Sequence, residues 1–388
     1  MVTPGIDRLL TADKSLLTGR RVGLLCNPAS VDAQFRHTAD RLFEDPDLTL
    51  AALFGPQHGF RSDLQDNMIE TPHTCDRKRK VPVFSLYSDT REPTEEMMQR
   101  IDLLVVDLQD VGTRVYTFVY TMANCMRVAA RHGIPVVVCD RPNPIGGEDV
   151  EGERLQAPWT SFVGQFPIPM RHGMTIGELA RLFNGEYGIG ADLTVIPLEG
   201  WRRSMYHDET GLPWVIPSPN LPTLDSAIVY PGAVLVEGTM LSEGRGTTRP
   251  FEIIGAPWID GEHLAVEMNA RGLPGVHFRP VFFEPTFQKH GRHSCGGCQI
   301  HVLDRRAFKP VRTAVELIDE FRLEDLRHFA WRDPPYEYER DKQPIDILYG
   351  SDRMRRTLDA DRDISVFIAE WRKDEDRFRS DREQYLLY

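Results

Sequence analysis

The segment GPQHGF, residues 55–60, places an amide and an imidazole between two glycines directly after the apolar run LTLAALF. A turn at this point requires Gly or Pro but neither Gln57 nor His58. Because Gly55 and Gly59 allow the backbone to turn sharply, we expect both side chains to point beyond the end of a strand and to bind a ligand. The amide of Gln57 is suited to hydrogen-bond a hydroxyl or acetamido group, or to position a water molecule.

Polar side chains also follow the other apolar runs of the N-terminal half. Asn27 follows RVGLLC, Asp107 and Asp110 follow LLVVD, and Asp140 and Arg141 follow PVVVC. Any one of these residues is adequately explained as a turn former or a helix cap. Ligands bind beyond the carboxyl ends of strands in open parallel sheets, so the set together predicts a binding cleft at this edge.

The elements that position these residues alternate between strand and helix. Short runs rich in Val and Leu, typical of strands buried on both faces, are separated by segments of helical period. Thr175 and Glu178 form a capping box that opens one helix, and Gly133 closes another. The pattern predicts an α/β, Rossmann-like, doubly wound and mainly parallel sheet.

A second domain is expected because the chain has 388 residues and single cores usually stop growing at about 250 to 300. The proline-rich segment 210–225 is read as an ordered loop or linker, and the runs FEIIGAPW, VHFRPVFFEP and GCQIHVL lack regular intervening helices. We therefore predict a smaller α+β domain over residues 236–388, after a first domain over 1–235, with the boundary between 225 and 250.

Composition excludes several classes of partner. A formal charge of −12 argues against nucleic acid and against an anionic membrane surface, which both require a basic face. No apolar stretch approaches the length of a membrane span, and the N-terminus lacks the pattern of a signal peptide. The sequence as given is expected to be cytoplasmic, or periplasmic or secreted if an export signal has been removed. The oligomeric state is not predicted.

No cofactor is expected. No GxGxxG follows the first strand, and GRGTT (244–248) lacks the lysine and spacing of a phosphate loop. The GxSxG elbow of the common serine hydrolases is missing. Cys295 and Cys298 form the sole CxxC, which without a second pair is a weak zinc signal, so no metal site is assigned.

Six long motifs carry a resemblance that covers most of the chain, from about residue 5 to 305. In order, they are GPQHGFRSD, DLQDVGTRVYTFVYTM, DRPNPIGGEDVEG, RHGMTIGELARLFN, TGLPWVIPSPNLPT and LVEGTMLSEGRGTTRPFEIIGAPWID. Together they resemble the bacterial exo-β-N-acetylmuramidase family of peptidoglycan hydrolases. The resemblance implies a Rossmann-like domain, an auxiliary domain, and a cleft between them that releases N-acetylmuramic acid from the non-reducing end of glycan fragments.

The chain departs from the family pattern at one position. The family's muramidase motif reads GPEHG, with its glutamate favoured as the catalytic residue, whereas Gln57 stands here. An amide neither donates a proton as an acid nor attacks an anomeric carbon. Either another carboxylate acts in its place or the activity differs.

Glycoside hydrolysis normally requires two carboxyl groups across the scissile bond. Glu243 is attractive because Gly244 and Gly246 permit close backbone approach to a ligand, and because Arg245 can clamp a carboxylate such as the lactyl group. An ordinary salt bridge to an arginine explains Glu243 equally well. The candidate catalytic residues are Gln57, His58, Asp110 and Glu243. The candidate substrate-binding residues are Asn27, Arg61, Asp63, Asp107, Arg114, Tyr116, Tyr120, Asp140, Arg141, Asn143, His172, Asn220, Glu237 and Arg245.

Two other classes remain open from the residues. In a metal-dependent hydrolase, the ligands of Mg²⁺ or Zn²⁺ would be His58, Asp63, Asp107 and Asp140. In a non-catalytic sugar or muropeptide binder, Gln57 would be a binding residue only.

Overall fold

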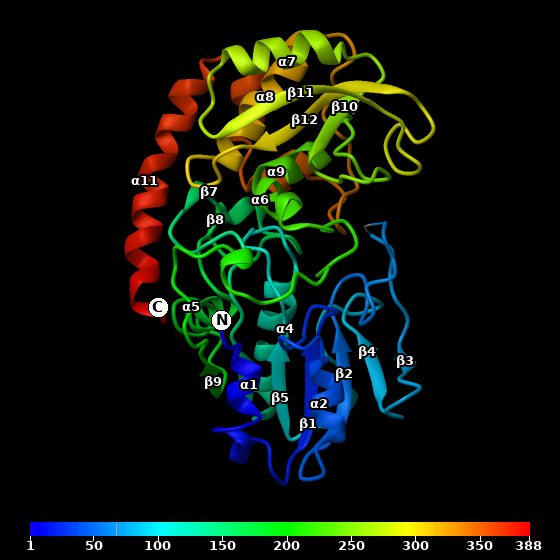
Figure 1. Ribbon diagram of the computed structural model, residues 1–388, viewed down its shortest axis with the longest axis vertical. Helices are drawn as coiled ribbons and strands as arrows, with labels where there is room; N and C mark the ends of the chain where they lie inside the picture. The colour runs from blue at the N-terminus through cyan, green and yellow to red at the C-terminus, as the bar shows by residue number, and fades with distance from the viewer. Residues whose placement is uncertain (67) are drawn as a thin grey trace.

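The computed structural model describes residues 1–66 and 68–388. It consists of a larger part built on a central sheet and a smaller part with its own three-stranded sheet, stacked end to end (Figure 1). The α/β class and the smaller α+β unit predicted from the sequence are both confirmed.

The central sheet has seven strands in the order β3-β4-β2-β1-β5-β6-β9. All neighbouring pairs are parallel except β3 with β4. The strands are β1 (Arg21–Cys26), β2 (Thr49–Gly55), β3 (Thr74–Cys75), β4 (Pro82–Ser85), β5 (Leu103–Asp107), β6 (Val136–Cys139) and β9 (Leu193–Ile196).

Helices cover both faces of this sheet, as the continuous apolar runs require. Alternating side chains enter two separate cores, so that Leu24 lies with α1 (Gly5–Leu9) and α2 (Thr38–Glu44) on one face. Leu25 lies on the other face with α3 (Glu95–Met98), α4 (Phe118–His132) and α5 (Ile176–Gly185). The predicted helix ends are also confirmed, since Thr175 and Glu178 form a capping box and Gly133 ends α4 with φ 64°.

The smaller part contains an antiparallel sheet in the order β10-β12-β11. Its strands are β10 (Ile253–Ala256), β11 (Val276–Phe283) and β12 (Cys295–Val302), and α6 (Leu224–Ala233), α7 (Gly261–Ala270) and α8 (Pro310–Glu324) pack with them. The two cysteines of the CxxC are buried free thiols in β12.

The C-terminal residues tie the two parts together. After α9 (Pro344–Tyr349) and α10 (Arg353–Asp359), α11 (Ile364–Arg382) runs along one side of both parts (Figure 1) and packs on the hairpin of β7 (Glu151–Arg154) and β8 (Pro169–Arg171). Arg382 at its end donates to the carbonyls of His172 (2.8 Å) and Gly173 (2.7 Å). Among the described helices, none is both long and apolar enough to cross a bilayer.

Candidate active site

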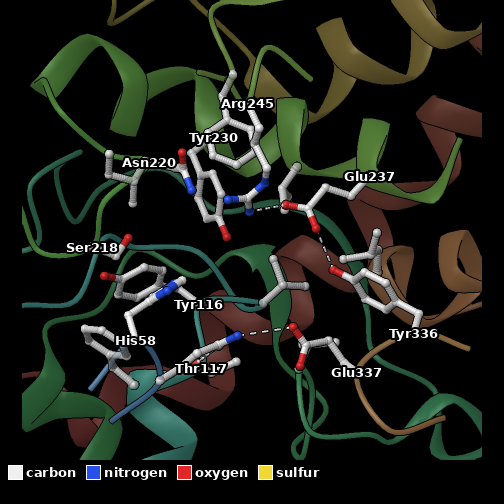
Figure 2. Close-up of a pocket in the computed structure, with 18 residues that line it drawn as sticks. His58, Tyr116, Thr117, Ser218, Asn220, Tyr230, Glu237, Arg245, Tyr336 and Glu337 are labelled. Atoms are coloured by element: carbon white, nitrogen blue, oxygen red, sulfur yellow. Dashed lines mark hydrogen bonds and ion pairs between the residues drawn. The ribbon is translucent and has the colours of Figure 1, made fainter. Parts of the chain in front are cut away.

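A cavity lies where the two parts meet. Its lining comes from the loop after β2, the start of α4, the segment 218–221, the 3₁₀ turn η4 (Val234–Gly238) and a loop before α9. Figure 2 shows carboxyl, guanidinium, phenol and imidazole groups turned toward this space.

The loop after β2 brings Gln57 and His58 to the lining of the cavity. Gly55 is required for packing, because a Cβ there would lie 2.6 Å from the backbone nitrogen of Phe60. His58 and Gly59 both adopt left-handed backbone angles, with φ 69° and 80°, a conformation that is uncommon for a non-glycine residue. The strand end therefore turns back on itself and leaves both side chains directed into the cavity.

His58 is a neutral hydrogen-bonding group. Its Nδ1 lies 2.8 Å from the carbonyl of Leu64, which leaves Nε2 as the acceptor when Nδ1 carries the proton. Burial, together with the positive charge of Arg245, lowers the pKa of His58 to about 4. At neutral pH the ring is therefore suited to accept a hydrogen bond from a sugar hydroxyl.

A carboxyl group that the sequence analysis overlooked, that of Glu337, reaches the cavity beside Gln57. Glu337 is 4% exposed and accepts hydrogen bonds from Nε2 of Gln57 (3.2 Å) and Oη of Tyr87 (2.9 Å). Burial raises its pKa to about 7, against the opposing effect of these two hydrogen bonds. Glu337 and Tyr338 both have positive φ, 42° and 72°, and such strained backbone often occurs at functional sites.

A second carboxyl group, that of Glu237, lies beside a cation on the other side of the cavity (Figure 2). Its Oε1 accepts a hydrogen bond from Nη2 of Arg245 (2.7 Å) and its Oε2 accepts one from Oη of Tyr336 (2.8 Å). A guanidinium group keeps its charge at all ordinary pH values. The two carboxyl groups therefore differ, since neutral groups hold Glu337 and a cation holds Glu237.

Glu243 contacts Arg245 but is absent from the described lining of the cavity. It pairs with Nζ of Lys289 (3.0 Å) and Nε of Arg245 (3.3 Å). Burial opposes its ionisation, but Lys289 and Arg245 outweigh burial and hold the pKa of Glu243 below its ordinary value. Lys289 also donates to the carbonyls of Val236 and Leu241, each over 3.0 Å.

The glycines that flank Arg245 serve the fold. A Cβ at Gly244 would lie 2.5 Å from the carbonyl oxygen of Ile253, and one at Gly246 would lie 2.8 Å from the backbone of Phe287. The close approach predicted at these positions is therefore made to the protein's own backbone.

Six of the predicted residues line the cavity together, namely Gln57, His58, Tyr116, Asn220, Glu237 and Arg245. Asn220 is oriented by the loop after β2, since its Nδ2 donates to the carbonyl of Gln65 (2.7 Å). The proline-rich segment 210–225 thus supplies part of the site.

The polar residues beyond β5 and β6 are engaged in the crevice of the sheet itself. Arg141 pairs with Asp107 (2.5 Å) and donates to the carbonyl of Val31 (3.1 Å). Asp140 accepts hydrogen bonds from Thr175 (2.8 Å) and from the backbone of Gly177 (2.7 Å) at the start of α5. Burial raises the pKa of Asp140 to about 7. These contacts fill the carboxyl edge with internal partners.

Other predicted residues have further structural contacts. Arg114 donates to the carbonyls of Leu348 (2.7 Å) and Tyr349 (2.6 Å). These bonds connect the segment before α4 to the end of α9. Asn143 bonds the backbone of Ile145 and Met174. Three further predicted residues are buried. The side chain of Asn27 accepts a hydrogen bond from Ser30, and Oδ2 of Asp110 lies 3.5 Å from Nε2 of His172. The ring of Tyr120 stacks on that of Phe183.

Arg61 and Asp63 lie apart from this group, on the lining of a separate surface cavity next to β3 and β4. Because Asp107 and Asp140 are also engaged elsewhere, the metal-ligand set His58, Asp63, Asp107 and Asp140 does not come together. Within residues 1–66 and 68–388, no cluster of three or more His, Cys, Asp or Glu side chains is arranged to hold a metal ion.

Sequence reasoning also missed several neutral groups around the carboxyl pair, namely Tyr87, Thr117, Ser218, Tyr230 and Tyr336. Glu337 belongs to the sequence PPYEYERD (334–341), which lies in a charged C-terminal region without helical period. The available signal was a glutamate between two tyrosines just after two prolines.

The pocket holds two carboxyl groups in different surroundings, Glu337 among neutral donors and Glu237 beside a cation. Such a pair is of the kind that glycosidases use. Comparison with known proteins agrees. Residues 22–225 match the family described as exo-β-N-acetylmuramidase NamZ, N-terminal, and residues 228–388 match its C-terminal counterpart. The chain therefore belongs to the NamZ exo-β-N-acetylmuramidase family.

Individual relatives match over the full chain. Peptidoglycan β-N-acetylmuramidase NamZ of Bacillus subtilis (strain 168) is 46% identical over 100% of this chain and 91% of its own length. Two crystal structures of DUF1343 family proteins from Bacteroides fragilis NCTC 9343 share the fold. One has a TM-score of 0.90 at 35% identity and the other 0.79 at 30%, each covering 100% of this chain and 99% of its own.

Proposed function

We propose that this protein hydrolyses the glycosidic bond of a terminal N-acetylmuramic acid at the non-reducing end of peptidoglycan fragments, with Glu337 as the proton donor. The observation that carries the proposal is the pair Glu337 and Glu237 on one enclosed cavity. Glycosidases assign acid and anion roles to two carboxyl groups by giving them different environments.

Glu337 fits the acid because its pKa of about 7 keeps a large protonated fraction at neutral pH. Its proton passes to the glycosidic oxygen as the bond to the anomeric carbon breaks, and the released alcohol carries that proton away. Water then adds to the anomeric carbon, and the proton it loses restores the acid.

Glu237 suits the role of the carboxylate that stabilises the transition state. Positive charge builds on the anomeric carbon in an oxocarbenium-like transition state, and a carboxylate that stays ionised stabilises it. Arg245 and Tyr336 fix the direction of this carboxylate through both of its oxygens.

Arg245 is also suited to recognise the acidic sugar. Among the described residues, its buried Nη1 has no hydrogen-bond partner. A guanidinium donor left over after pairing with Glu237 matches the lactyl carboxylate that distinguishes muramic acid from glucosamine.

The pocket form supports action at a chain end, since a pocket accepts a terminal sugar more readily than the middle of a strand. The experiment is to incubate the protein with the disaccharides MurNAc–GlcNAc and GlcNAc–MurNAc and to separate the products. Release of N-acetylmuramic acid from the first disaccharide alone is expected. Tight binding without cleavage of either disaccharide would instead identify a sugar binder.

A further inference from the structure

Glu337 belongs to a chain of three side chains that begins at the start of α4. Oγ1 of Thr117 donates to Oε1 of Gln57 over 2.7 Å, and Nε2 of Gln57 donates to Oε1 of Glu337 over 3.2 Å. Figure 2 shows Thr117 and Glu337 on the same side of the cavity. All three side chains are buried.

The direction of the Gln57 amide matters because its two ends have opposite effects on a carboxyl group. An NH₂ group donates to the ionised form, whereas the amide oxygen can only accept from the protonated form. The Thr117 hydroxyl donates to the amide oxygen, and the NH₂ group faces Glu337.

We propose that Gln57 is a positioning residue that holds the Glu337 carboxyl group and sets the pH range of its proton transfer, and that Thr117, by donating to the amide oxygen, helps to hold the amide in this direction. This inference rests on the proposed function for its catalytic meaning, although the side-chain contacts stand without it. It gives Gln57 a role that uses the chemistry of an amide, which donates a hydrogen bond without adding a second acid.

The surroundings of Glu337 leave few other groups to exert this control. The phenol of Tyr87 donates to Oε2, Glu237 contributes a negative charge that favours protonation, and Arg245 contributes a positive charge that opposes it. Gln57 therefore acts on one oxygen and Tyr87 on the other, in the same sense, against the effect of burial.

A glutamate at position 57 would behave differently. Two carboxyl groups at this separation cannot both ionise freely, so they would share one proton and titrate as a pair. Gln57 removes that coupling and leaves Glu337 to titrate as a single acid.

The test is a direct titration of Glu337 in the full-length protein by infrared difference spectroscopy, with its carboxyl band assigned by comparison with Glu337→Gln. The variants are Gln57→Met, which keeps the side-chain length without a donor, and Thr117→Val, which keeps the shape without the hydroxyl. Thr117→Ser is the matched control because it retains the hydroxyl.

The titration midpoint of Glu337 should rise by about one unit in Gln57→Met, because a donor to the ionised form is lost. It should rise in Thr117→Val and stay near the wild-type value in Thr117→Ser. An unchanged midpoint in Gln57→Met would overturn the role of Gln57, and equal midpoints in Thr117→Val and Thr117→Ser would overturn that of Thr117. If Gln57→Met does not fold, the role of Gln57 is judged from Thr117→Val, in which the hydroxyl no longer holds the amide, and an unchanged midpoint there overturns it.

The same samples separate this inference from the proposed function. Full hydrolysis by Glu337→Gln would refute the catalytic role of Glu337 while leaving the shifts in its midpoint intact. Unshifted midpoints with an inactive Glu337→Gln would refute the role of Gln57 alone.

Discussion

The side-chain amide of Gln57 donates to the carboxyl group of Glu337 over 3.2 Å, although 280 positions separate the two residues in the chain. The resemblance to the muramidase family implies a glutamate at position 57, and the carboxyl group of Glu337 lies one hydrogen bond from the amide that stands there. This carboxyl group is supplied by a loop near the C-terminus, so the site is complete only when that loop packs against the end of β2.

The rate of hydrolysis should fall as pH rises through about 7, because Glu337 must be protonated to act as the acid. His58, with a pKa of about 4, should not contribute a step between pH 5 and 9. The measurement is kcat/KM on a muramic acid glycoside across this range. A rate that keeps rising up to pH 9 would contradict the assignment.

Glu337 should also make stability depend on pH. Folding raises its pKa from the ordinary 4.5 to about 7, so its favourable contribution is complete below pH 4.5 and is lost as pH rises toward 7. Glu337→Gln lacks this loss. The unfolding free energy of Glu337→Gln minus that of wild type should therefore be about 3 kcal/mol larger at pH 8 than at pH 4. Urea denaturation at the two pH values tests this, and an unchanged difference would contradict it.

Arg245→Lys should lower kcat/KM about 10- to 100-fold, since a lysine keeps the charge but loses the planar fork that serves Glu237 and the lactyl group together. Arg249→Lys is the control, because Arg249 lies in the same loop and pairs with Glu252 instead. Calorimetry should show weaker binding of N-acetylmuramic acid to Arg245→Lys, with little change for N-acetylglucosamine. Equal weakening for both sugars would count against lactyl recognition.

Lys289→Met should destabilise the protein by roughly 3 to 5 kcal/mol, because it leaves Glu243 buried beside a single remaining cation. Adding Glu243→Gln should recover part of that loss, since the amide carries no charge. The control is Lys373→Met at an exposed position of α11. Thermal melting compares the four proteins, and a Lys289→Met protein as stable as the control would refute the support role.

The sequence predicted the elements whose signal is local. The run LLVVD coincides with β5, and the Thr175 capping box and Gly133 mark real helix ends. Such features depend on burial of both sheet faces and on backbone geometry, which neighbouring residues determine.

The active site was predicted less completely because its partners meet through packing. Asp107 and Arg141 look like ligand-binding residues at strand ends, but they satisfy one another in the crevice. A turn with positive φ places Glu337 at the cavity, and no hydrophobic periodicity in the sequence predicts such a turn. The sequence directs attention to the amide of Gln57, whereas the carboxyl group that it contacts comes from a distant segment.

The most direct test of the account compares leaving groups in the variant Glu337→Gln. A general acid matters when the departing alcohol is a poor leaving group and matters little when it is a good one. We predict that Glu337→Gln loses about 10²- to 10⁴-fold in kcat/KM on MurNAc–GlcNAc but far less on a dinitrophenyl muramic acid glycoside. Glu339→Gln, which changes a carboxyl group two residues away that pairs with Lys342, should match wild type on both substrates. Equal losses on the two substrates, or wild-type cleavage of MurNAc–GlcNAc by Glu337→Gln, would contradict the assignment of Glu337 as the proton donor.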